Sequence, residues 1–179
     1  MQPIETERLI LRNFQEGDAE ALFAYLQAPV SSCFLDLRLA DLAAARAETA
    51  TRSGDDQQIA VALKGTGQLI GDLFPHPEAE EPDTVSIGWN FNPAFAGRGF
   101  ALEAARALFD YFFSTAAARR LYACVEDHKT RSRQLCEGLG MRQEGTFVEF
   151  ATFTSDAAGQ PIYENTMQYA LLRREQENG

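Results

Sequence analysis

Hydrophobic and polar residues alternate in short runs along much of this chain, and loops containing glycine, proline or acidic residues separate the runs. Alternation with a period of two is typical of strands that bury one face. The KGTG sequence at residues 64–67 predicts a hairpin turn between two such strands. The predicted strands lie at residues 8–14, 59–63, 68–74, 84–91, 120–126, 142–153 and 161–172.

Other segments have apolar residues at intervals of three and four, the spacing of a helix with one buried face. They predict helices at 17–27 and from Phe100 through residue 113, and alanine and leucine content predicts a third at 38–51. A fourth helix is expected at 132–141, with Gly140 as a left-handed cap. The order of strands and helices predicts an α/β fold in which a mixed sheet carries helices on both faces.

The length of 179 residues and the mixed composition favour one globular domain spanning residues 1–179. The N-terminus lacks the apolar core of a signal peptide, and no stretch approaches the roughly 18 apolar residues that span a bilayer. We therefore expect a soluble, cytoplasmic protein without a membrane partner. Cys33, Cys124 and Cys136 lack metal-binding spacing, which predicts buried free thiols and no metal site.

Charge is distributed unevenly along the chain. The formal net charge of −10 argues against nucleic acid as a partner, since such binding depends on neutralising phosphates. Between Arg98 and Arg133, however, seven basic residues stand against four acidic ones. This contrast predicts a small anionic ligand at the basic stretch and a cationic partner elsewhere.

The sequence NPAFAGRGF, at residues 92–100, joins a predicted strand to a predicted helix. Gly97 and Gly99 would let the backbone approach a phosphate closely, the first turn of the helix has unpaired N–H groups, and Arg98 adds a positive charge. The patterns of a mononucleotide P-loop and of a dinucleotide fold are both absent. An ordinary strand-to-helix turn is the alternative to an anion site.

NPAFAGRGFALEA resembles the pyrophosphate loop of the GNAT superfamily of acyl-CoA-dependent N-acyltransferases. IETERLILRNFQEGDAEAL resembles the opening strand and helix of its ribosomal-protein-alanine acetyltransferase (RimJ/RimL) branch, SIGWNFNP its cofactor strand, and HKTRSRQLCEGLGMRQEG its NxxSxxLxxxxGF segment. The resemblance covers nearly the whole chain. It departs at Ala96, where relatives carry glutamine or arginine, and at Lys129, where they carry asparagine.

The resemblance implies a mixed, mostly antiparallel sheet with helices on both faces and a splayed central pair of strands. It also implies acetyl-CoA as cofactor, with the pantetheine arm along the splayed strand and the diphosphate on the glycine-containing loop. Lys129 would reach a phosphate as a point charge. The implied cofactor-binding residues are Asn90, Phe91, Gly97, Arg98, Gly99, Phe100, Ala101 and Lys129.

Acyl transfer from a thioester to an amine needs a neutral amine, a polarised carbonyl and a protonated leaving thiolate. A backbone N–H near Phe91 would polarise the carbonyl. By resemblance, Ser132 would protonate the thiolate and Glu149 would act as the base, since Ser86 occupies the place of a glutamate found in other members. Ser132 as a helix N-cap, Glu149 as a solvated strand residue, and a water relay as the base are the alternatives.

These observations predict an N-acetyltransferase that moves an acetyl group from acetyl-CoA to a primary amine by direct attack in a ternary complex. The amine would belong to a protein N-terminus, a polyamine, an aminoglycoside-like molecule or an amino-acid derivative. A non-catalytic acyl-CoA-binding or sensing module, a nucleotide-dependent enzyme and a longer acyl donor stay open. The sequence shows no apolar stripe that demands a dimer, so we expect a monomer or a homodimer.

Overall fold

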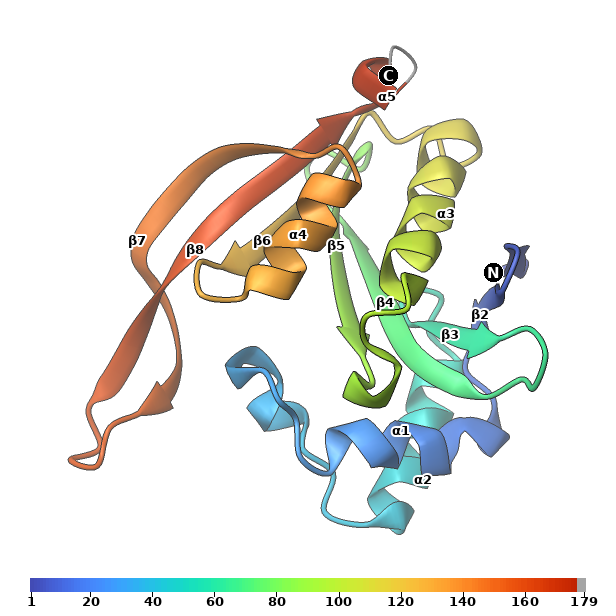
Figure 1. Ribbon diagram of the computed structural model, residues 1–179, viewed down its shortest axis with the longest axis horizontal. Helices are drawn as coiled ribbons and strands as arrows, with labels where there is room; N and C mark the ends of the chain where they lie inside the picture. The colour runs from blue at the N-terminus through green and yellow to red at the C-terminus, as the bar shows by residue number, and fades with distance from the viewer. Residues whose placement is uncertain (177–179) are drawn as a thin grey trace. The chain divides into compact units, whose positions relative to one another are not determined.

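The computed structural model describes residues 1–176, and Figure 1 shows how its strands and helices follow one another. The strands are β1 Ile4–Glu5, β2 Leu9–Asn13, β3 Ile59–Leu63, β4 Leu69–Pro77, β5 Thr84–Phe91, β6 Arg120–Glu126, β7 Arg142–Ser155 and β8 Pro161–Leu172. The helices are α1 Ala19–Leu26, α2 Leu42–Ser53, α3 Phe100–Ser114, α4 Thr130–Gly138 and α5 Arg173–Gln176, with short 3-10 helices at Glu16–Asp18, Ser32–Leu37 and Pro93–Phe95.

The predicted mixed α/β fold is confirmed. The strand order is β1-β2-β3-β4-β5-β6-β8-β7, in which β5 and β6 run parallel while β1–β2, β2–β3, β3–β4, β6–β8 and β7–β8 are antiparallel. The parallel pairing joins only residues 84–86 to residues 120–122. The remaining residues of β5, up to Phe91, therefore continue beyond this ladder.

Several predicted details were wrong. Helix α2 spans Leu42–Ser53 and not residues 38–51. Strand β4 continues through Pro77, so the first residues of the predicted loop at 75–83 are extended strand. Helix α4 begins at Thr130, two residues before the predicted start. Cys124 is exposed, whereas Cys136 is buried as expected. The cause at Cys124 is strand alternation, because the neighbouring Ala123 and Val125 occupy the buried face of β6.

The chain packs as two compact units whose boundary passes through β4, β5 and α3. The first unit comprises residues 1–75 and 89–108, and the second comprises residues 76–88 and the chain from Phe109 onward. The prediction of one acetyltransferase domain over residues 1–179 stays a prediction. Over residues 1–176, no helix has the length and hydrophobicity that crossing a bilayer requires.

A buried ionic cluster joins α1 and α2 to β4 in the first unit. The Asp72 carboxylate accepts a hydrogen bond from the Tyr25 hydroxyl at 2.6 Å and one from Nη1 of Arg52 at 3.2 Å, while Nε of Arg52 donates to Glu48 at 2.7 Å. Apolar side chains surround it, including that of Phe14, whose ring lies 5.4 Å from the Arg52 guanidinium carbon. Because a buried charge is costly unless it is paired, this cluster permits few alternative registers of the two helices.

In the second unit, β7 and β8 form a long curved hairpin (Figure 1). Several of its large apolar side chains are exposed, which the sequence patterns did not indicate, and the expectation of a monomer or a homodimer stays a prediction. The pattern was hidden because the β7 register shifts between Gln143 and Gly145, between Phe147 and Ala151, and between Thr152 and Thr154. The exposed side chains are Phe147, Val148, Phe150, Phe153, Ile162 and Tyr163.

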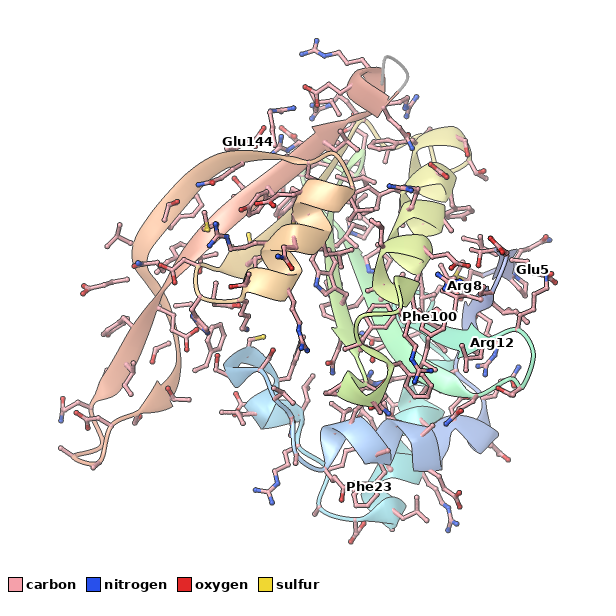
Figure 2. The ribbon with its side chains drawn as sticks, in the orientation of Figure 1. Glu5, Arg8, Arg12, Phe23, Phe100 and Glu144 are labelled. Atoms are coloured by element: carbon pink, nitrogen blue, oxygen red, sulfur yellow. The ribbon has the colours of Figure 1, made fainter. Side chains whose placement is uncertain are left out.

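Glu144 on β7, labelled in Figure 2, is paired with Arg120 of β6 and Arg142 of β7. Arg120 donates to both carboxylate oxygens, at 3.0 and 2.5 Å, and Nη2 of Arg142 donates to one of them at 2.5 Å. The hydrogen bond from Arg120 is the largest influence on the carboxyl group; partial burial opposes it, and Arg142 reinforces it. Together they lower the pKa of Glu144 to about 2.

We expect Glu144→Gln to lower the free energy of unfolding at pH 7 by about 1 kcal/mol, the upper range for an ion pair at the protein surface. Because the native pKa is depressed, this contribution exists above the unfolded pKa of about 4.5 and is lost as the pH falls toward 2. Urea denaturation from pH 7 to pH 3 measures it. Glu80→Gln, at an exposed loop position, is the control that we expect to show no such trend, and a pH-independent Glu144 effect would contradict the assignment.

Candidate functional site

The residues predicted to bind and transform the substrates divide between the two compact units. Asn90, Phe91 and residues 97–101 belong to the first unit, whereas Lys129, Ser132 and Glu149 belong to the second. The structure therefore brings the expected diphosphate loop together with the end of β5. Of the two expected catalytic residues, Ser132 lies on α4 and Glu149 on β7.

The loop between β5 and α3 has the conformation that its glycines suggested. Asn92 accepts a hydrogen bond from the Ala94 N–H at 3.0 Å through its side chain, and Pro93 starts a single 3-10 turn. Gly97 and Gly99 then adopt φ angles of 76° and 78°. Such left-handed values are strained for any residue with a Cβ, which accounts for glycine at both positions.

The backbone N–H groups from Gly97 to Leu102 have no hydrogen-bond acceptor within residues 1–176. The first amide of this region with a main-chain partner is that of Glu103, which donates to the Gly99 carbonyl at 3.0 Å. These free donors lie at the positive end of the α3 dipole, beside the exposed side chain of Arg98. The arrangement fits a ligand with several anionic oxygens.

Arg8 and Glu103, which the sequence patterns did not identify, connect this loop to the start of β2. Glu103 in the first turn of α3 accepts from Nε of Arg8 at 2.6 Å, from the Arg8 N–H at 2.9 Å and from the Thr6 hydroxyl at 2.6 Å. Nη1 of Arg8 also donates to the Arg98 carbonyl at 3.0 Å. The guanidinium carbon lies 4.7 Å from the centre of the Phe100 ring. Figure 2 labels both residues.

The last residues of β5 are held by β4. The Asn92 N–H donates to the Ile70 carbonyl at 2.9 Å, and the ring of Phe91 covers Gly71, where an added Cβ would lie 2.5 Å from Cδ1 of that ring. Because backbone groups alternate in direction along a strand, the N–H of Phe91 points away from β4. It is therefore available on the edge of β5 opposite β4.

Lys129 is part of a nearly buried ion pair. Its ammonium nitrogen lies 2.5 Å from Oε2 of Glu126, and both side chains are at least 87% buried, with exposed fractions of 13% and 10%. The ring of Phe153 lies 5.9 Å from the same nitrogen. The positive charge of Lys129 is thus largely compensated within its own unit.

Ser132 is the third residue of α4 and is half-buried. Because the helix begins at Thr130 with Lys129 as its N-cap residue, Ser132 is not the N-cap, so that alternative was wrong. In this position its hydroxyl lies on the first turn of the helix, where it is close to the unpaired amides.

Glu149 lies in the bulge between Phe147 and Ala151, where β7 has two more residues than β8, and its φ angle is 50°. Its N–H donates to Oδ1 of Asn165 at 2.9 Å, and Nδ2 of Asn165 donates to Asp127 at 2.9 Å. A left-handed non-glycine residue is uncommon, and bulges often redirect a side chain beside an active site. Asn165 thus links Glu149 to the segment that leads into α4.

A surface cavity of about 500 Å³ lies elsewhere in the second unit. Its arginine Arg119 is already paired with Glu81 and Asp83, both at 3.1 Å. None of the predicted site residues lines this cavity. Its lining residues are Asp83, Ala117, Arg119, Leu172, Arg173 and Arg174.

Comparison with known proteins identifies the family. Residues 8–142 match the Acetyltransferase (GNAT) domain. The chain belongs to the GNAT family. The match includes the loop at 97–101 and all of α4, and it shows that this GNAT protein is an acyltransferase enzyme.

Individual relatives agree with this assignment. The uncharacterized N-acetyltransferase YnaD of Bacillus subtilis is 30% identical over 145 residues, which cover 80% of this chain and 85% of YnaD. The uncharacterized N-acetyltransferase p20 of Bacillus licheniformis is 28% identical, with 98% of both chains covered. The crystal structure of a GNAT-family acetyltransferase from Bacillus anthracis superimposes with a TM-score of 0.85 at 27% identity, covering 97% of this chain and all of that one.

The ion pair at Lys129 gives a prediction that separates a structural from a ligand-binding role. Lys129→Ala leaves Glu126 nearly buried without its counter-charge, so we expect the free energy of unfolding to fall by about 3 kcal/mol. Guanidinium denaturation measures this loss. The double variant Glu126→Gln/Lys129→Met removes both charges and should recover most of the stability. A Lys129→Ala variant as stable as the wild type would show that the pair contributes little.

Proposed function

We propose that this GNAT enzyme transfers the acetyl group of acetyl-CoA to a primary amine by direct attack in a ternary complex. The observation that carries the proposal is the row of free N–H groups from Gly97 to Leu102 at the start of α3. A diphosphate has enough oxygens to accept from several of these donors at once, and the space beside Gly97 is open, since an added Cβ would meet nothing within 4 Å.

The proposed binding residues follow the path of an extended donor along the first unit. Residues 97–101 hold the diphosphate through their main-chain amides, so Ala96 in place of glutamine or arginine removes one side chain but no main-chain donor. Asn90 and Phe91 bind the pantetheine arm at the end of β5, as an added strand would bind. Lys129 stays in the proposed set with a small expected contribution, because Glu126 offsets its charge.

The acyl donor supplies a thioester carbonyl that an amine nitrogen can attack. In the proposed reaction the nitrogen–carbon bond forms, the carbon–sulfur bond breaks, and the sulfur takes up a proton. The N–H of Phe91 polarises the carbonyl oxygen. Glu149 accepts a proton from the amine, directly or through water, and the Ser132 hydroxyl passes a proton to the sulfur.

The acceptor class is inferred from charge. The chain has a net charge of −10 although residues 98–133 are locally basic, so acidic groups predominate elsewhere and favour a cationic amine. Resemblance to the RimJ/RimL branch adds a protein N-terminus to the candidates, beside a polyamine, an aminoglycoside-like molecule and an amino-acid derivative. Action in the cytoplasm, and a monomeric or homodimeric assembly, stay predictions.

The diphosphate site can be tested with two glycine variants matched in backbone strain. Gly97→Ala and Gly159→Ala both place a Cβ at a left-handed position, with φ angles of 76° and 79° and no atoms within 4 Å of the new carbon. Each should cost about 1 kcal/mol in stability. We expect Gly97→Ala alone to raise the calorimetric Kd for coenzyme A, by about tenfold. Equal Kd values in the two variants would contradict the loop assignment.

Catalysis is tested by thiol release from acetyl-CoA with a panel of peptide, polyamine, aminoglycoside and amino-acid amines, with acetylated products identified by mass. We expect Glu149→Gln to lower kcat by about a hundredfold, as for loss of a general base, and Ser132→Ala to lower it less. Glu137→Gln, an exposed change on α4, is the control. Tight binding of coenzyme A without thiol release from any amine would favour a non-catalytic acyl-CoA-binding module.

If both catalytic-site variants keep full turnover, the assignments of Glu149 and Ser132 are wrong even though the transfer reaction stands. A Glu149→Gln variant that keeps kcat while Ser132→Ala loses it would favour a water relay as the base.

A further inference from the structure

The Arg8 side chain makes three kinds of contact with the segment that the proposed function assigns to the diphosphate. Its guanidinium group forms a two-nitrogen fork around one carboxylate oxygen of Glu103, with Nε and Nη2 both 2.6 Å from Oε2. It donates through Nη1 to the Arg98 carbonyl, between the two left-handed glycines. It also stacks over the Phe100 ring (Figure 2).

The contact with Arg98 constrains the loop directly. A carbonyl that points toward Arg8 turns the peptide plane between Arg98 and Gly99, so the Gly99 N–H points the opposite way. Nη2 of Arg8 also lies close to Gly99, 3.5 Å from where a Cβ on that residue would be. Arg8 thus holds one of the free donors in its observed direction.

The contact with Glu103 concerns charge. A carboxylate in the first turn of α3 stabilises the helix, but it also repels any anion that approaches the same amides. Partial burial opposes ionisation of Glu103, yet the hydrogen bonds from Thr6 and Arg8 lower its pKa below the ordinary value. Glu103 is therefore ionised, and its exposed fraction of only 17% leaves Arg8 as its counter-charge.

We propose that Arg8 is a positioning residue for a diphosphate-bearing donor: it fixes the peptide between Arg98 and Gly99 and neutralises Glu103 beside the anion site. This inference rests on the proposed function. Arg8 acts through other residues, so no contact between Arg8 and the donor is needed. Its effect depends on the charge of the ligand, which a purely structural connection between β2 and α3 would not produce.

The experiment measures the Kd of two ligands by calorimetry, using displacement titration for the weaker one. Coenzyme A carries the diphosphate, and pantetheine lacks it. We expect Arg8→Gln to raise the Kd for coenzyme A by about tenfold and to leave the Kd for pantetheine unchanged, because an uncompensated carboxylate then faces the anion. Arg8→Lys, which keeps the charge but loses the fork, should fall between the wild type and Arg8→Gln.

Two further variants control for charge and folding. The double variant Arg8→Gln/Glu103→Gln removes both charges and should recover most of the coenzyme A affinity. Lys64→Gln removes one positive charge from the exposed ion pair with Glu5 in the same unit and should change neither Kd. If Arg8→Gln does not fold, Arg8→Lys and Glu103→Gln still test the inference, and the latter should bind coenzyme A at least as tightly as the wild type.

The inference fails if Arg8→Gln weakens both ligands equally, if it weakens neither, or if removing Glu103 as well recovers nothing. It also fails if Lys64→Gln weakens coenzyme A binding as much as Arg8→Gln does. Failure of the proposed function gives a different result, since the wild type would then show no heat of coenzyme A binding at all.

Discussion

Two left-handed backbone positions, Gly97 and Gly99, determine what the start of α3 presents to a ligand. With φ near +77° at both, the chain turns from the 3-10 helix into α3 without using the amides of residues 97–102 for its own hydrogen bonds. A chain that left so many donors unpaired in a buried place would be destabilised, but here residues 97–99 are exposed and residues 100–102 are half-buried. Solvent can satisfy these amides, which leaves them available to the proposed diphosphate.

The second unit also contains a residue in the left-handed conformation, but this residue is not a glycine. Where the loop before α3 relies on residues without side chains, β7 places a full glutamate side chain at a left-handed position inside a bulge. The conformation of Glu149 is held by Asn165, which in turn contacts Asp127. The hydrogen bond to Asn165 fixes the backbone of Glu149 in this uncommon conformation, and so fixes the point from which the proposed base extends.

Most of the fold could be predicted because strand alternation is a local property. Strands 59–63, 84–91, 120–126 and 161–172 have the predicted bounds, since turn and loop residues mark where each of these runs begins and ends. The shifts within β7 could not be foreseen, because an extra residue changes the facing of every residue after it. For the same reason the exposed apolar side chains of the hairpin looked like part of a regular strand.

The sequence patterns identified some residues of the candidate site and missed others. The glycines of the loop carry a local signal, whereas Arg8 and Glu103 are 95 residues apart and ordinary in their own surroundings. Lys129 did have a local signal that went unused: Glu126 lies three residues before it, a spacing at which opposite charges meet on one face when the backbone turns. A basic residue near an anion site is informative only after its nearest acidic neighbours are considered.

Gly71 allows close packing between β4 and the end of β5 because it has no Cβ. The ring of Phe91 and the carbonyl of Asn90 occupy the volume where any other residue would carry its first side-chain carbon. Substitutions there would displace the end of β5, so selection at residue 71 is tied to events on a neighbouring strand. A larger residue at position 71 therefore requires a smaller or displaced side chain at position 91, so the two positions have to change together.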